Sequence, residues 1–229
     1  VGGGESPRPG EVSLAHHGVL FLDEFAEFRR QALESLRQPL EDGSVQIARA
    51  RARATFPARP LVVAAVNPCA CGYFGHPICK CQCNDLQRRR YRGRLSGPLL
   101  DRIDLHCPVP AVDVMALRLV GSAESSEQVR HRVVEARTRQ RQRYETGLVR
   151  ASTNSTLSLA EAEAVAKIDR LSRRLLERAT ARLGLSARAY LRVLRVARSI
   201  ADLEQQPSVR EAHVSEAIQG RLLDRNTPA

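Results

Sequence analysis

The segment that most constrains the fold is the apolar run Val19–Leu22, which is followed at once by two carboxylates, Asp23 and Glu24. Four apolar residues are too few for a core helix but are typical of a strand buried on both faces, as in a parallel sheet. A second apolar run, Leu61–Val66, predicts another strand of this kind, and it ends at Asn67. Because α/β sheets bind ligands at the carboxyl ends of their strands, these three polar residues are candidates for one site.

An apolar run followed by Asp-Glu is the Walker B pattern of P-loop ATPases, in which the Asp holds Mg²⁺ and the Glu orients the attacking water. Beside such a strand, Asn67 is a candidate for positioning the same water against the γ-phosphate. The ordinary alternatives stay open: Asp23 and Glu24 can form a solvated turn, and an Asn before Pro is a common turn former.

The partner motif of Walker B is missing from the sequence. A Walker A loop reads Gly-x-x-x-x-Gly-Lys-[Ser/Thr], and neither of the two lysines, Lys80 and Lys167, follows a glycine. The chain also begins without Met, so we expect it to be a piece of a longer protein whose N-terminal part carries the loop. We therefore expect these 229 residues alone neither to bind ATP tightly nor to hydrolyse it.

The character of the chain changes after Pro110. Before it, the strand signals are joined by a predicted helix over Phe28–Leu40 and by loose alternation over Val45–Phe56. After it, helical periodicity dominates, which places a domain boundary between Pro110 and Ser125. The predicted fold class is α/β with a parallel sheet, followed by an all-α domain.

The helical half carries explicit start and stop signals. Ser158 and Ser208 each begin a capping-box pattern, Gly184 is expected to end a helix, and Ser186 can N-cap the next one. That helix places four apolar side chains on one face: Ala189, Val193, Val196 and Ile200.

The composition favours a polyanionic partner. The net charge is +11 and all but two of the 36 basic residues are Arg, which matches phosphate bidentately. A high-GC genome would also raise the Arg content, so charge alone does not decide the matter. Aromatic residues make up only 4% of the chain and Trp is absent, which argues against a base-stacking platform.

Five of the six cysteines lie in residues 69–83, in the pattern Cys69-x-Cys71 and Cys79-x-Cys81-x-Cys83. In a chain without a leader or an apolar span, which we expect to be soluble and cytoplasmic, such clustering favours Zn²⁺ over disulfides. His76 is a possible substitute ligand, and a redox-sensitive thiol cluster is the alternative. Cys107 is expected in the core.

Several arginines stand out by position. Arg49, Arg51 and Arg53 alternate along a predicted strand or hairpin and so would share one face, which is either a solvated face or a binding face. Arg102 lies between two acids, as in a structural ion pair. Arg188 lies in the first turn of a predicted helix, where a cation opposes the helix dipole, and a residue that breaks a local rule is a candidate for functional use.

With these residues together, the chain resembles the ComM/YifB-type magnesium-chelatase-like AAA+ ATPases, from Gly2 through Leu223. The matching segments include Pro9–His16, the Walker B run and Ser96–Leu105. The resemblance implies a partial AAA+ P-loop NTPase core over residues 1–112, with the cysteine-rich insertion at 69–83. It also implies a helical lid domain over residues 118–224, of the kind found at the C-terminus of magnesium chelatase.

The resemblance implies a role for each candidate. Asp23 would bind the Mg²⁺ of Mg-ATP, Glu24 would be the catalytic base and Asn67 the sensor 1 residue. Arg102 would be an arginine finger acting on a neighbouring subunit, and Arg188 the sensor 2 residue of the lid. Arg49, Arg51 and Arg53 would contact DNA from a pore hairpin. The implied zinc ligands are Cys69, Cys71, Cys81 and Cys83, with Cys79 as an alternate.

The implied function is that of an ATP-driven motor on branched or single-stranded DNA in recombination and transformation, working as a homo-oligomer, a hexameric ring in the full-length protein. In this family the P-loop strand lies between the sensor 1 strand and a strand formed by Ile103–Val109, so we expect this chain to expose apolar surface there. The alternatives are a non-enzymatic, zinc-stabilised DNA-binding or adaptor protein, and the ATPase subunit of a porphyrin magnesium chelatase.

Overall fold

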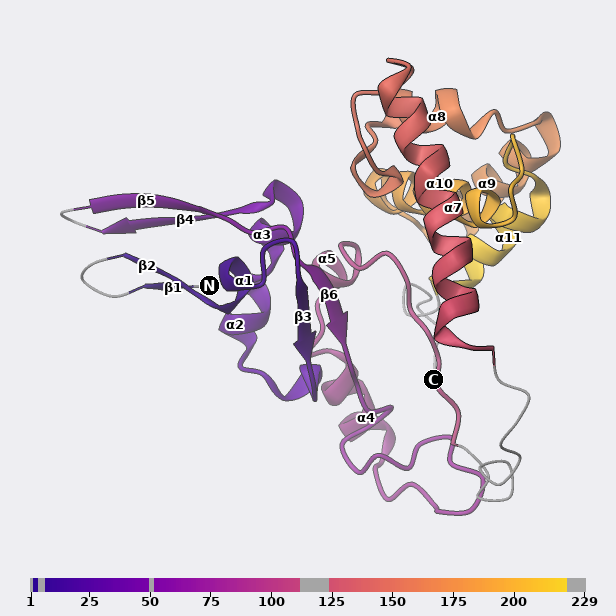
Figure 1. The fold of residues 1–229 in the computed structure, drawn as a ribbon. Coiled ribbons are helices and arrows are strands. Elements are labelled where there is room, and N and C mark those ends of the chain that lie inside the picture. The colour runs from indigo at the N-terminus through magenta and orange to yellow at the C-terminus, as the bar shows by residue number, and fades with distance from the viewer. Residues whose placement is uncertain (1, 4–6, 50–51, 112–123, 222–229) are drawn as a thin grey trace. The chain divides into compact units, whose positions relative to one another are not determined.

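The computed structural model describes residues 2–3, 7–49, 52–111 and 124–221 (Figure 1). Two compact units divide the chain, the first ending at Arg102 and the second beginning at Ile103, and each has its own apolar cluster. Most of the segment in which the sequence places the domain boundary, between Pro110 and Ser125, lies outside the described residues. No helix in the described ranges combines the length and the apolar character that crossing a membrane requires.

A parallel strand pair organises the first unit. β3 (Val19–Leu22) and β6 (Leu61–Ala64) lie side by side, with Val19 opposite Leu61 and Leu22 opposite Ala64. Three short elements precede them: β1 (Gly2–Gly3), β2 (Arg8–Pro9) and α1 (Glu11–Leu14). Both predicted strands and their parallel pairing are confirmed.

The burial expected for these strands is wrong on one face. Leu20 and Leu22 pack against the apolar cluster of the unit, but Val19 is 61% exposed, Phe21 60% and Leu61 64%. The cluster lies on one side of the strand pair only, so alternate side chains point into it and the others do not. The expected strand over residues 103–109 is also wrong, because this segment has no regular structure. Leu105 and Val109 of this segment are exposed, as expected of its apolar residues.

The helix predicted over Phe28–Leu40 is two helices in the structure. The single-turn η1 (Phe25–Glu27) leads to α2 (Arg30–Ser35), and α3 (Arg37–Asp42) follows directly. Pro39 has no N–H to donate to the carbonyl of Ser35, four residues earlier, so the helical hydrogen bonding stops there. The predicted apolar stripe still reaches the core through Leu33 and Leu36, which are buried.

The alternating segment forms a hairpin that projects from the first unit (Figure 1). β4 (Ser44–Arg49) pairs antiparallel with β5 (Ala52–Pro57), and Val45 and Ile47 anchor its base in the apolar cluster. The cysteine segment follows β6 and leads to α4 (Asp85–Arg92) and α5 (Gly97–Leu100).

The second unit is a helical bundle built around its longest apolar helix. Its elements are α7 (Ser126–Glu145), η2 (Asn154–Thr156), α8 (Leu159–Ala166), α9 (Arg170–Leu183), α10 (Ala187–Leu203) and α11 (Glu211–Gln219). α10 contacts α7, α8 and α11, and its residues Val193, Leu194 and Ala197 are fully buried. The predicted order of an α/β part followed by an all-α part is confirmed.

Most of the predicted helix ends are confirmed. Ser158 caps α8 in a capping box with Glu161, Gly184 ends α9 in the left-handed conformation (φ 62°), and Ser186 accepts the Ala189 N–H at the start of α10. The box predicted at Ser208 is wrong, because α11 begins at Glu211.

The reason for the late start of α11 lies in the residues that precede it. The backbone N–H of Val209, whose side chain is buried, donates to the carbonyl of Ala166 at 2.8 Å, which commits that residue to a contact outside the helix. His213 then accepts the backbone N–H of Arg210 at 2.9 Å.

A charged network is buried inside the helical unit. Asp202 is 1% exposed and accepts hydrogen bonds from Arg198 at 3.0 Å and Arg143 at 2.8 Å. Asn154 donates to the same carboxylate at 2.8 Å. These contacts join η2, α7 and α10, so one carboxylate holds three segments of the bundle together.

Candidate functional site

The carboxyl edge of the β3–β6 pair collects three predicted site residues. Asp23 and Glu24 follow β3, Asn67 follows β6 after a short extension, and because the strands are parallel both ends lie at the same edge. All three side chains are exposed. Carboxylate and amide oxygens are hard ligands of the kind that Mg²⁺ prefers, so the donor set at this edge fits the metal of Mg-ATP.

The backbone at Glu24 adopts an uncommon conformation that shapes this edge. Glu24 is left-handed (φ 49°, ψ 42°), a region that non-glycine residues enter at some cost in free energy. Its N–H donates to Oδ1 of Asp23 at 2.8 Å, and the N–H of Phe25 donates to the carbonyl of Ala65 at 2.9 Å. The turn thus fixes the chain that carries both carboxylates to the neighbouring strand segment.

Arg102 is placed inside the first unit. It is only 9% exposed, forms an ion pair with Glu41 and donates to the carbonyl of Pro98 at 2.6 Å. The sequence pointed to the adjacent acids as partners and missed Glu41, which lies far away in the chain and at the end of another helix. Nothing in the local pattern could have indicated that pair.

The remaining predicted arginines lie in three places. Arg188 is exposed in the first turn of α10, in the second unit. Arg53 is exposed on β5, Arg49 is the last residue of β4, and Arg51 lies outside the described residues. The antiparallel register pairs Arg49 with Ala52 and Arg53 with Ala48. Residues opposite each other in this register share a face, so position 49 and Arg53 lie on opposite faces of the hairpin, and the shared face expected for these arginines is wrong for this pair.

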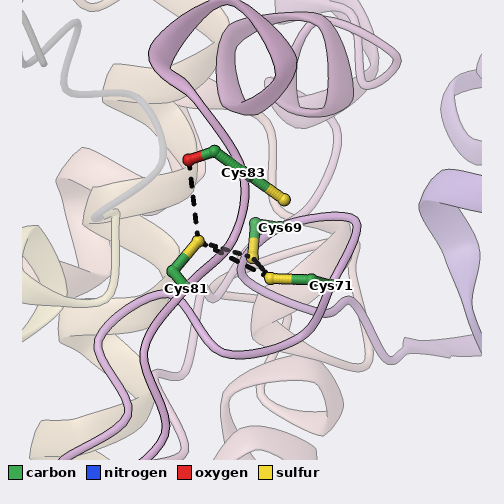
Figure 2. A group of neighbouring side chains, drawn as sticks. All are labelled: Cys69, Cys71, Cys81 and Cys83. Atoms are coloured by element: carbon green, nitrogen blue, oxygen red, sulfur yellow. Dashed lines mark hydrogen bonds between the residues drawn. The ribbon is translucent and has the colours of Figure 1, made fainter.

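Four cysteine sulfurs converge in the loop after β6 (Figure 2). The Sγ atoms of Cys69, Cys71, Cys81 and Cys83 all lie within 4.8 Å of one another. Cys69 Sγ is 3.4 Å from Cys71 Sγ and 3.6 Å from Cys81 Sγ. Four sulfurs around a tetrahedral Zn²⁺ would lie about 3.8 Å apart, given Zn–S bonds of about 2.3 Å. The cluster therefore fits the zinc ion implied by the sequence.

The thiols of the cluster differ in pKa. Hydrogen bonds from the backbone of Tyr73 and Gln82 lower the pKa of Cys71 to about 6. The backbone of Cys71 favours the Cys83 thiolate, but the neighbouring Cys71 sulfur and partial burial outweigh it and raise the pKa of Cys83 to about 11. Burial raises the pKa of Cys81. A thiolate that forms readily beside protonated thiols is suited to a cation that displaces the remaining protons.

The other candidate ligands lie outside this group of four. Cys79 is exposed, and Nδ1 of His76 accepts the backbone N–H groups of Ile78 at 3.1 Å and Cys79 at 2.9 Å. That nitrogen is thus used to shape the loop. Cys107, expected in the core, is exposed, so that expectation is wrong.

Comparison with protein families gives two matches along the chain. The family described as "Magnesium chelatase, subunit ChlI" matches residues 1–117, and the one described as "Magnesium chelatase, subunit ChlI C-terminal" matches residues 123–221. The first match contains the sheet edge and the cysteine cluster, and the second contains the helical bundle.

Curated relatives match along almost the whole chain. YifB of Escherichia coli (strain K12) is 42% identical over 229 residues, and competence protein ComM of Haemophilus influenzae is 44% identical over 226 residues. Each alignment covers 98% of this chain and 43% of the relative. Rv2897c of Mycobacterium tuberculosis is 42% identical over 222 residues, again 43% of its length. The chain therefore spans less than half the length of the curated relatives it matches, and it belongs to the magnesium-chelatase family as a member of the ComM/YifB type.

Proposed function

We propose that this chain is the hydrolytic part of an ATP-dependent AAA+ motor that acts on branched or single-stranded DNA in the cytoplasm. The observation that carries the proposal is the parallel register of β3 and β6, which brings Asp23 and Glu24 to the same sheet edge as Asn67. The name of the relative from H. influenzae, a competence protein, supports a role in competence.

In this proposal each residue at the edge has one task. Asp23 holds the Mg²⁺ of Mg-ATP, Glu24 accepts a proton from the attacking water, and Asn67 orients that water. Bound Mg²⁺ supplies charge stabilisation for the transferred phosphoryl group. The hydrogen bond from the Glu24 N–H to Asp23 Oδ1 fixes the backbone between the two carboxylates, so that each keeps its own task.

The nucleotide-holding part of the site comes from elsewhere in a longer protein. No Gly-Lys-[Ser/Thr] sequence occurs in the 229 residues, and the alignments cover 43% of the relatives. A P-loop roughly 50–60 residues before Gly18 in the coding sequence would agree with this arrangement. An ATP affinity below one micromolar, measured by calorimetry on the 229-residue chain, would contradict it.

In a ring of subunits, Arg188 and Arg102 each have a role at a nucleotide. The full-length protein works as a hexamer, Arg188 reaches the nucleotide from the lid, and Arg102 acts on the ATP of a neighbouring subunit. Arg102 would have to exchange Glu41 for a phosphate, so its action depends on the nucleotide state of the ring. The hairpin carrying Arg49, Arg51 and Arg53 contacts DNA.

The central test uses full-length protein and the variant Glu24→Gln. We expect this variant to bind ATP as the wild type does and to lose about 10²–10⁴-fold in kcat, because a catalytic base contributes about that factor. The matched control is Glu127→Gln on α7, which removes an exposed carboxylate in the other unit and should leave kcat unchanged. An unchanged kcat for Glu24→Gln would remove Glu24 as the base.

The cysteine cluster of this motor holds zinc. Metal analysis of purified protein should find about one Zn per chain, and Cys81→Ser should lower that content. Cys79→Ser is the matched control, because this exposed thiol lies outside the group of four and should leave the zinc content unchanged. Zinc-free protein with every thiol freely titratable would end the zinc proposal.

The family description also supports a second candidate, the ATPase subunit of a porphyrin magnesium chelatase. Such a subunit would be stimulated by a chelatase partner and would be indifferent to branched DNA. Measuring ATP turnover of the full-length protein with each addition separates the two functions.

A further inference from the structure

α4 carries a concentrated positive charge that the proposed motor does not use. Four of its eight residues are arginines, and Arg89, Arg90 and Arg92 are exposed. Among the ion pairs of the described residues, the one that involves α4 joins Arg88 to Asp85. Arg89 and Arg92 are three positions apart and so lie on one side of the helix. We name Arg89, Arg90 and Arg92 the α4 basic surface.

An aromatic ring from the cysteine loop fixes this helix in place. The guanidinium carbon of Arg88 lies 4.8 Å from the centre of the Phe74 ring, and that of Arg92 lies 5.4 Å from it. Both distances are in the range of a cation–π contact, and Arg88 also donates to the carbonyl of Cys83 at 2.7 Å. One loop residue thus restrains two arginine side chains on successive turns.

The four-thiol cluster is joined directly to the start of α4. Cys83 immediately precedes Asn84, whose side chain caps the helix by accepting the Gln87 N–H at 2.8 Å, while the Gln87 side chain accepts the Asn84 N–H at 2.9 Å. A metal that closes the thiol cluster therefore also fixes the first turn of the helix and the loop that carries Phe74.

We propose that the α4 basic surface binds the phosphate backbone of nucleic acid, and that the thiol cluster positions it for this contact. The chemistry favours phosphate because guanidinium groups pair with phosphate oxygens bidentately and are weakly hydrated. The proposed contact is to the phosphate backbone, and contacts of this kind carry no sequence information directly. The inference rests on the proposed action on DNA and adds a second contact to that of the β4–β5 hairpin.

The test measures nucleic-acid binding by the full-length protein over a range of salt concentrations. The probes are fluorescently labelled duplex DNA, single-stranded DNA, a four-way DNA junction and RNA of the same sequence. We expect Arg89→Gln/Arg90→Gln to weaken duplex binding about 10-fold near physiological salt. It should also lower the slope of log K against log salt by about 2, since each phosphate contact contributes about 0.9.

The matched control is Arg174→Gln/Arg178→Gln on α9, which removes two exposed arginines from the helical unit and should change neither quantity. Zinc content and circular dichroism of Arg89→Gln/Arg90→Gln should equal those of the wild type, which separates a lost contact from a lost fold. Cys81→Ser should lose zinc and weaken binding in the same direction, as a surface held by the cluster requires.

The outcomes distinguish the two proposals. Suppose that the wild type binds DNA and that Arg89→Gln/Arg90→Gln binds equally well with the same salt slope. The proposed role of the α4 basic surface is then wrong, while the proposed action on DNA stands. If the wild type binds none of the probes, both proposals fall. Equal losses on DNA and RNA support the surface, because the phosphate backbone is common to both.

Discussion

The helical unit and the N-terminal unit differ in how completely each buries its apolar residues. In the bundle, apolar side chains from α8, α9, α10 and α11 form one cluster, and Leu176, Val193 and Val214 have no exposed surface. In the N-terminal unit the strand pair buries one face, while Val19, Phe21 and Leu61 on the other are more than half exposed. The bundle buries its apolar side chains by itself, whereas the sheet leaves an apolar face that a further layer could cover.

The two units also treat charge differently. The bundle encloses a carboxylate, Asp202, between Arg198 and Arg143. The N-terminal unit keeps Asp23 and Glu24 exposed at the edge of its sheet. The enclosed charges hold helices together, whereas the exposed ones remain available to a ligand.

The largest expected effect comes from breaking the enclosed network. Asp202→Ala leaves Arg198 and Arg143 buried without a counter-charge, which typically costs about 3–5 kcal/mol of stability. Urea denaturation followed by far-ultraviolet circular dichroism measures the loss. Asp85→Ala removes an exposed carboxylate that pairs with the partly buried Arg88 of the other unit and should cost about 1 kcal/mol or less. Equal costs for the two variants would contradict the contrast in charge.

A smaller effect is expected from shortening apolar side chains. Leu176→Ala opens a cavity in the bundle and should cost about 2–5 kcal/mol. Phe21→Ala removes a ring that is largely exposed and should change the stability of the chain by about 0.5 kcal/mol or less. The same denaturation experiment compares them, and a large loss for Phe21→Ala would show that the outer face of the sheet is covered.

The smallest effect is a pH dependence confined to the start of α8. Hydrogen bonds from the Ser158 side chain and backbone lower the pKa of Glu161 from 4.5 to about 2. Because the folded-state value is depressed, this contribution to stability is present above about pH 4.5 and is lost as the pH falls towards 2. Glu161→Gln should flatten the stability profile of the bundle in that window, and Ser158→Ala should reduce it in part. An unchanged profile in both variants would rule out the box as its source.

Short-range signals explain why much of the fold could be predicted. The caps at Ser158, Gly184 and Ser186 act within four residues, so the sequence places them correctly. The start of α11 was misplaced because the contact of Val209 with Ala166 joins residues far apart in sequence. The break between α2 and α3 at Leu36 follows from the missing N–H of Pro39, which the apolar stripe concealed.

The candidate sites also divide into features set by local sequence and features set by tertiary packing. Parallel pairing brings Asp23 and Asn67 to one edge, and tight C-x-C spacing brings the sulfurs together, so both groupings follow from the sequence. The pairing of Arg102 with Glu41 and the position of Phe74 beside Arg88 depend on tertiary packing between separate segments. The unbroken apolar run Val19–Leu22 also predicted burial of β3 on both faces, but such a run does not say which layers cover a sheet.

The parallel pairing of β3 with β6 has a consequence for the time course of synthesis. The two strands are separated by about 40 residues of chain, so at roughly 5–20 residues per second β3 leaves the ribosome about 2–8 s before its partner exists. During that interval Val19 and Phe21 belong to an unpaired strand with free backbone groups, which is the state in which nascent chains aggregate. α8 to α11 follow one another along the chain, so their contacts close soon after each helix emerges. The unit that contains β3 and β6 therefore has a greater need of a chaperone than the helical unit.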